Sequence, residues 1–144
     1  MAKEIRRLSI NDYDDILRIW SDAGLPYKPL GRDSRERMAK EMEFPGAAFF
    51  GLFDNGLMIG LGIANYDGRR GWINRVALDP DQRGLGLAGM IIAACENFLH
   101  DVGALVICAL IEEMNSPSMA CFSKAGYVPE REIIYWTKRP SPDS

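Results

Sequence analysis

The sequence is poor in the residues that build metal and disulfide sites. Its 144 residues include three cysteines and one histidine. An odd number of cysteines argues against a disulfide framework, and the spacing of Cys95, Cys108 and Cys121 suits no metal. Each cysteine stands in an apolar stretch, so we expect three buried free thiols and no metal site. This cysteine usage is typical of a reducing compartment, and we predict a cytoplasmic protein.

Long apolar runs and a strong charge of one sign are also missing. No apolar stretch is long enough to cross a membrane, and the start of the chain lacks the features of a signal peptide. The 17 basic and 20 acidic residues give a net charge of −3. Proteins that bind nucleic acids usually carry a basic surface, which this balance does not favour. We therefore expect neither a membrane nor a nucleic acid as partner, and one domain with one core.

What the sequence does contain is a glycine-rich stretch behind an apolar run. Residues 72–78 have the composition of a strand, and Asp79-Pro80 end it because proline has no N–H for a β-ladder. Three glycines follow within residues 84–89, and an apolar pattern of helical period starts at Leu87. The first N–H groups of a helix lack partners within the helix and favour an anion. The stretch predicts a phosphate or pyrophosphate site, although a plain loop before a core helix fits the glycines equally well.

Two nucleotide-binding motifs resemble parts of this stretch. No Lys-Ser or Lys-Thr follows the glycines, which excludes a Walker A loop. Residues 84–89 match the G-x-G-x-x-G of dinucleotide-binding domains, with Glu112 as the acidic residue beyond the next strand. In those domains the first strand runs almost directly into the first glycine, whereas residues 79–83 intervene here. A nicotinamide or flavin site is therefore a distant alternative.

The stretch resembles more closely the acyl-CoA-binding motif Val-x-Leu-x-Pro-x-x-Arg-x-x-Gly-x-Ala of the GNAT N-acetyltransferase superfamily. The matching residues are Val76, Leu78, Pro80, Arg83, Gly86 and Ala88. The resemblance implies that the amides of residues 84–89 bind the CoA pyrophosphate. It also implies that the backbone of residues 76–78 pairs with the pantetheine arm like an added strand. The implied contacts to acetyl-CoA are Val76, Ala77, Leu78, Arg83, Gly84, Leu85, Gly86, Leu87, Ala88 and Gly89.

A second GNAT signature is an asparagine that opens a helix ending in Gly-Phe or Gly-Tyr. Asn115 and Gly126-Tyr127 match it, and the resemblance gives Asn115 a contact with CoA, while a helix cap fits it as well. Phe122 stands where the family often has the tyrosine that protonates the leaving thiolate. It has no proton to give, so the resemblance leaves it only as a cofactor contact. Asn74 stands where many members carry a carboxylate base, and an amide is a poor base.

The residues that would move protons therefore stay unknown. Glu112 and Glu113, at the end of a predicted strand beside the cofactor, are weak candidates for the base, and solvated charges fit them better. Tyr135 or Tyr127 could replace the missing acid. An enzyme that relies on positioning alone fits equally well. A non-catalytic acyl-CoA-binding or regulatory module of the same fold is the alternative for the whole protein.

The acceptor is implied only as an amine of a small molecule or a protein. Tyr27 and Arg32 lie in a proline-rich loop, and in the GNAT fold the segment between the first two helices commonly forms one wall of the acceptor site. They are therefore expected substrate contacts, although a solvated connector also fits this loop. The resemblance leaves a homodimer open.

Hydrophobic periods and turn residues predict the element order β-α-α-β-β-β-α-β-α-β. This is the α/β (α+β) GNAT fold, a mixed, mostly antiparallel twisted sheet flanked by about four helices. The expected strands are Ile5–Ile10, Ala47–Phe53, Leu57–Tyr66, Gly71–Leu78, Ala104–Ile111 and Val128–Thr137. We expect residues 1–137 to form a single GNAT acetyltransferase domain, followed by a flexible tail, 138–144. The charges around Lys40-Glu41 are predicted to form a solvated helix face with i,i+4 pairs.

Overall fold

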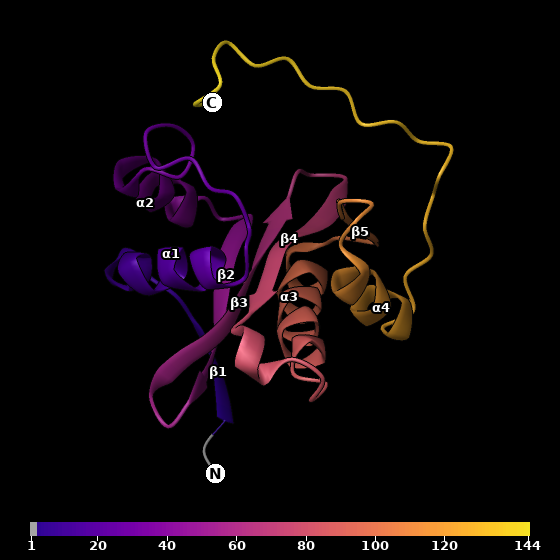
Figure 1. Cartoon of the computed structure of the whole chain (residues 1–144). Helices are drawn as coiled ribbons and strands as arrows, with labels where there is room; N and C mark the ends of the chain where they lie inside the picture. Colours follow the sequence, from indigo (N-terminus) through magenta and orange to yellow (C-terminus); the bar gives the residue numbers. More distant parts are fainter. Residues whose placement is uncertain (1–2) are drawn as a thin grey trace.

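Five strands form one mixed sheet in the order β1-β2-β3-β4-β5 (Figure 1). The computed structural model describes residues 3–144, so Met1 and Ala2 of the predicted domain lie outside it. The strands are β1 (Lys3–Arg7), β2 (Ala47–Asp54), β3 (Leu57–Tyr66), β4 (Arg70–Leu78) and β5 (Val106–Ala109). Strands β1 to β4 are antiparallel neighbours, and β5 joins β4 in parallel. This arrangement confirms the predicted fold class.

Four helices cover the two faces of the sheet. They are α1 (Tyr13–Asp22), α2 (Arg35–Glu43), α3 (Ala88–Val102) and α4 (Ser116–Lys124). Helices α1 and α2 lie on one face, and α3 and α4 lie on the other (Figure 1). None of the helices in residues 3–144 is long and apolar enough to cross a membrane.

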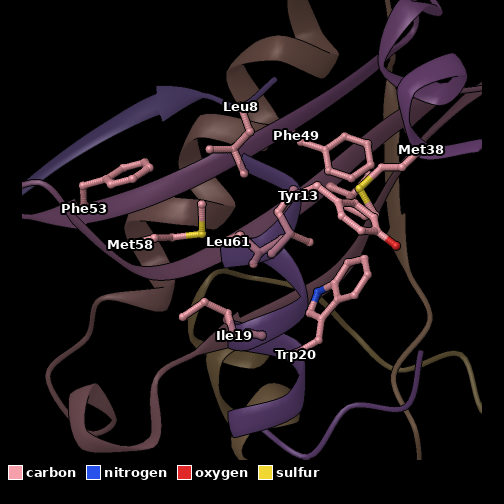
Figure 2. Packing of buried hydrophobic residues seen from close by; sticks show 12 residues of the cluster. Leu8, Tyr13, Ile19, Trp20, Met38, Phe49, Phe53, Met58 and Leu61 are labelled. Atoms are coloured by element: carbon pink, nitrogen blue, oxygen red, sulfur yellow. The ribbon is translucent and has the colours of Figure 1, made fainter. Parts of the chain in front are cut away.

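Each face of the sheet has its own apolar core. On the α1/α2 face, Trp20 and Met38 pack with Phe49 and Leu61 from the sheet (Figure 2). On the other face, α3 contributes a fully buried stripe to the second core. Glycines in β3 let α3 approach closely: a Cβ on Gly62 would lie 2.6 Å from Ile91 Cγ2. Gly60 and Gly62, the two glycines of β3, therefore serve close helix packing.

The last predicted strand, Val128–Thr137, is wrong for the chain as the structure describes it. These residues form no ladder and run away from the body of the protein after α4 (Figure 1). Their large apolar side chains are exposed, with Trp136 at 86%. Composition shows that a segment can form a strand, but a ladder also needs an edge within reach, and here the chain leads the segment away from β5.

An ion pair ties β1 to the turn before α1. Arg6 donates two hydrogen bonds to the carboxylate of Asp12, at 2.9 and 3.1 Å, and the Ser9 N–H donates a third at 2.9 Å. The bond from Arg6, followed by that from Ser9, lowers the pKa of Asp12 below its ordinary 3.8, against the opposing effect of burial. Bidentate, charge-assisted bonds to a buried carboxylate are among the stronger polar contacts in proteins.

We expect Asp12→Asn to lower the free energy of unfolding by about 1–2 kcal/mol at neutral pH, because a neutral amide keeps only part of these bonds. Because the pKa of Asp12 is lowered on folding, its stabilising effect is complete above 3.8 and is lost as the pH falls through the folded-state value. Urea unfolding of both proteins between pH 2 and 7 should show the difference shrinking in acid. Asp15→Asn is the control, since Asp15 is 52% exposed and pairs with Arg18 at 3.4 Å. A difference that stays constant down to pH 2 would contradict the assignment.

Candidate functional site

Strands β4 and β5 stop pairing half-way along β4. They pair only from Arg70↔Val106 to Ile73↔Ala109. Strand β4 then continues from Asn74 to Leu78, where β3 is its only strand neighbour among the described residues 3–144. Among residues 3–144, the backbone groups of this stretch that point away from β3 have no strand partner, and we call the space beside them the opening. Such an edge can take an extended ligand as an added strand.

The glycine loop lies at the end of this opening. A short 3-10 turn, Pro80–Gln82, follows β4, and α3 begins at Ala88. Within residues 3–144, no hydrogen bond links the backbone N–H groups of residues 84–89 to a protein acceptor, and no side chain caps α3. Gly84 and Gly86 have φ angles of +80° and +74°, a conformation that disfavours any side chain. The loop therefore presents free donors at the positive end of a 15-residue helix dipole, which suits a phosphate or pyrophosphate.

Helix α4 follows β5 along the chain. Asn115 is its N-cap, and its side-chain oxygen accepts a hydrogen bond from the Ser118 N–H at 3.2 Å. Phe122 is buried in the second core with its ring edge against Tyr127. The Tyr127 hydroxyl donates to Glu96 at 2.7 Å, and burial followed by this bond raises the pKa of Tyr127. A phenol held this way is a poor candidate for the missing acid.

A β-bulge shapes β4 beside the opening. The β3–β4 register shifts between Leu61↔Ala77 and Ile63↔Asn74, and Arg75 has φ +55°. The bulge turns Arg75 toward the α1 face, where its guanidinium lies 4.2 Å from the centroid of the Trp20 ring and donates to the carbonyl of Pro26. Burial lowers the pKa of Arg75. At the bulge, Arg75 therefore connects β4 to the loop between α1 and α2.

A half-buried carboxylate, Glu41, lies on the same face of the sheet. Asn74 donates to the side-chain oxygen of Asn65 at 3.4 Å, and the Asn65 side chain lies close enough to Glu41 on α2 to affect the pKa of that carboxyl. Burial raises the pKa of Glu41, the Asn65 hydrogen bond opposes this, and Asp33 adds to it. This corrects the prediction of a solvated face at Lys40-Glu41. Lys40 does pair with Glu36 in solvent, at 3.6 Å, but Glu41 is half-buried.

The comparisons with known proteins agree with this geometry. The family model described as "Acetyltransferase (GNAT) family" matches residues 13–127. The chain belongs to the GNAT acetyltransferase family. An acetyltransferase of Yersinia pestis (strain Pestoides F) is 25% identical over 133 residues, which cover 91% of this chain and 92% of that protein. The protein is therefore an acyltransferase enzyme.

Solved GNAT structures share the fold at low sequence identity. The PaiA N-acetyltransferase of Thermoplasma acidophilum, in complex with coenzyme A, has a TM-score of 0.76 and 19% identity, covering 88% of this chain and 89% of that one. AAC(6')-Iy, in complex with the bisubstrate analogue CoA-S-monomethyl-acetylneamine, has a TM-score of 0.80 and 15% identity, covering 96% and 99%. At such identities the likeness shows the fold alone.

The GNAT fold brings some of the predicted site residues together and leaves others apart. Residues 76–78 and 84–89 flank the same opening. Tyr27 packs near Trp20, whereas Arg32 lies at the surface beside Asp33. The proposed proton carriers are dispersed: Glu112 and Glu113 are exposed in the loop after β5, and Tyr135 is 67% exposed in the segment that leaves the body.

Glu41 is the residue that the sequence-based reasoning missed. A signal for it exists, because Met38 and Met42 mark the inward side of α2 and Glu41 is three residues after Met38, on that side. The charged residues around it concealed this pattern.

Proposed function

We propose that this acetyltransferase moves an acetyl group from acetyl-CoA to an amine of a small molecule or a protein, by direct attack in a ternary complex. The observation that carries the proposal is the row of free amides at residues 84–89, at the end of a strand whose neighbour has turned away. We assign this activity to one domain, residues 1–137, with 138–144 as a tail.

The glycine loop would hold the donor by its diphosphate. The free N–H groups of residues 84–89 and the dipole of α3 favour two negative charges there. Arg83, exposed at the loop start, adds a cation, and Asn115 lies on the far side. No Cβ-sized obstacle lies within 4 Å of Gly84, Gly86 or Gly89, so the loop leaves room for the ligand. These residues fit the group that the family binds.

The opening beside β4 would orient the reacting end. When bound, acetyl-CoA supplies an acetyl group already activated as a thioester. The backbone N–H groups between Asn74 and Leu78 that face the opening would pair with the pantetheine arm, and one of them would donate to the thioester carbonyl. Such fixed donors stabilise the charge that develops on that oxygen, and they need no side-chain acid.

The acceptor would enter from the α1/α2 face. Tyr27, next to Trp20, and Arg32 lie on the loop that borders this face. Glu41, at the end of the Asn74–Asn65 pair, is the carboxylate best placed to attract a cationic amine and to take its proton, directly or through water. A raised pKa makes a carboxylate a stronger base.

Two measurements test the proposal. Isothermal titration should show acetyl-CoA binding with a dissociation constant below hundreds of micromolar, and NADH should not compete. Release of the CoA thiol should then be followed across a panel of mono-, di- and polyamines, amino sugars and peptide N-termini. Turnover on any amine supports transfer and excludes a pure binder. Tight acetyl-CoA binding without turnover on the whole panel would favour the non-catalytic module, and absence of binding would reject both.

A further inference from the structure

The guanidinium of Arg75 lies on the α1/α2 face with most of its hydrogen-bond donors unused. It stacks 4.2 Å from the centroid of the Trp20 ring and donates to the carbonyl of Pro26. Within residues 3–144 this carbonyl is its only hydrogen-bond acceptor, and its buried Nε has no partner. A buried donor without an acceptor is unfavourable, and proteins usually supply one. The Arg75 side chain therefore has free donors for a ligand.

The backbone at Arg75 is strained in a way that places this side chain. Its φ of +55° lies in the left-handed region, which residues other than glycine seldom adopt. Strain of this kind is concentrated at functional sites. The bulge turns Arg75 toward the α1/α2 face, while the next residue, Val76, begins the stretch that we propose to bind the pantetheine arm. Arg75 is thus one residue away from the proposed donor site.

The charges near Arg75 leave one cation and one anion unpaired on the same face. Asp33 is engaged, because it accepts the Lys28 N–H at 2.8 Å and lies 3.7 Å from Nε of Arg32. Within residues 3–144, neither Arg75 nor Glu41 has an ion-pair partner within 4.0 Å. The two are still close enough for each to affect the pKa of the other. Opposite charges that are near each other but unpaired suit the two ends of a zwitterion.

We propose that the acceptor is an amino acid, an amine that also carries a carboxylate, and that Arg75 binds this carboxylate. A guanidinium matches the planar fork of a carboxylate and binds it through two parallel N–H groups. The inference rests on the proposed acetyl transfer and adds the substrate class to it.

The same arrangement directs the other end of the amino acid to Glu41. The ammonium group gives one proton to Glu41, directly or through water, and becomes a free amine. The nitrogen then forms a bond to the acetyl carbon, and the C–S bond of the thioester breaks. The second proton that the nitrogen loses neutralises the CoA thiolate. The products are the N-acetylated amino acid and the CoA thiol.

The first test compares amino acids with their decarboxylated counterparts in the wild type. Phenylalanine and phenethylamine, lysine and cadaverine, and 4-aminobutyrate and propylamine each differ by one carboxylate. We expect kcat/KM for release of the CoA thiol to favour the amino acid of at least one pair by about 10- to 100-fold, as charge-assisted hydrogen bonds commonly do. A wild type that releases the thiol but favours the amino acid in no pair would overturn the inference and leave acetyl transfer standing. Absence of release on every compound would reject both.

The second test asks whether Arg75 itself recognises the carboxylate. Arg75→Met should lower kcat/KM for the amino acid by about 10- to 100-fold, mainly through KM, and lose far less with the decarboxylated amine. Each substrate is compared with itself, so the different basicity of the paired amines cancels. Arg75→Lys, which keeps the charge but not the fork, should retain part of the preference. Arg69→Met, which removes an exposed cation from the β3–β4 turn, should retain all of it.

A purely structural role of Arg75 gives a different result. If Arg75 only holds the loop at Pro26, Arg75→Met should lose equally on both members of a pair, and that outcome would overturn the inference. Titration with acetyl-CoA, expected to be unchanged, reports whether the variant is folded. The comparison of substrates in the wild type needs no variant, so it decides the substrate class even if Arg75→Met does not fold.

Discussion

Replacing Gly86 by glutamate is expected to abolish acetyl-CoA binding. Gly86 has φ +74° and open space where a Cβ would stand, so a glutamate side chain would project from the loop that offers free amides to the diphosphate. Two like charges about 4 Å apart repel by about 4 kcal/mol at an effective dielectric constant near 20. Since about 1.4 kcal/mol is tenfold in affinity, we expect a loss of at least about 100-fold by isothermal titration.

Two variants separate this effect from backbone strain. Gly86→Ala carries the strain of a positive φ without the charge, and it should weaken binding far less than glutamate does. Gly68→Glu carries the same charge at another exposed glycine of positive φ, in the β3–β4 turn at the opposite end of β4, and it should leave binding unchanged. If Gly86→Glu bound acetyl-CoA as the wild type does, the diphosphate site would not be at this loop.

The features that could be predicted from the sequence are those that depend on near neighbours. Pro80 ends a strand, a glycine loop precedes a helix and Asn115 caps one, each because of chemistry within a few residues. Hydrophobic periodicity and turn residues predicted the four α-helices and the five strands that form the sheet. It predicted a sixth strand at 128–137 by the same rule, and failed because strand formation also depends on a distant edge.

The features that could not be predicted depend on contacts between distant parts of the chain. The bulge at Arg75 results from the way β4 pairs with β3. The φ of +55° at Arg75 could not be predicted from the sequence, because a non-glycine residue gives no sign of a positive φ. The proposed role of Glu41 depends on the packing of α2 over β2, the neighbour of β3 in the sheet. In our proposal, a carboxylate from α2 takes the place of the one that the family resemblance leads us to expect on β4.

Replacing Glu41 by glutamine is expected to lower kcat while leaving acetyl-CoA affinity unchanged within about twofold. Glutamine keeps the shape of the side chain, but it cannot take a proton from the acceptor amine. Removal of a general base commonly costs about 10²- to 10⁴-fold in rate. Titration with acetyl-CoA and initial rates of CoA-thiol release, with an amine found in the panel, separate binding from turnover.

The Glu41→Gln change should lower the rate but increase the stability of the folded protein relative to the wild type. Burial raises the folded-state pKa of Glu41 above its ordinary 4.5, so the wild type loses stability as the pH rises from that value through the folded pKa. The variant has no such loss, and its thermal stability relative to the wild type should therefore increase over that window. If the variant has a lower kcat but is no less stable than the wild type, the loss of rate is due to the missing carboxylate and not to unfolding.

The controls decide which carboxylate serves the reaction. Glu43→Gln, on the exposed side of the same helix, should leave both kcat and stability unchanged. Glu112→Gln and Glu113→Gln, the candidates at the end of β5, should also keep the wild-type rate if Glu41 is the base. We expect kcat/KM of the wild type to rise with pH, and this rise should disappear only in Glu41→Gln. A full rate in Glu41→Gln, with a large loss in either variant after β5, would assign the proton transfer to the exposed pair instead.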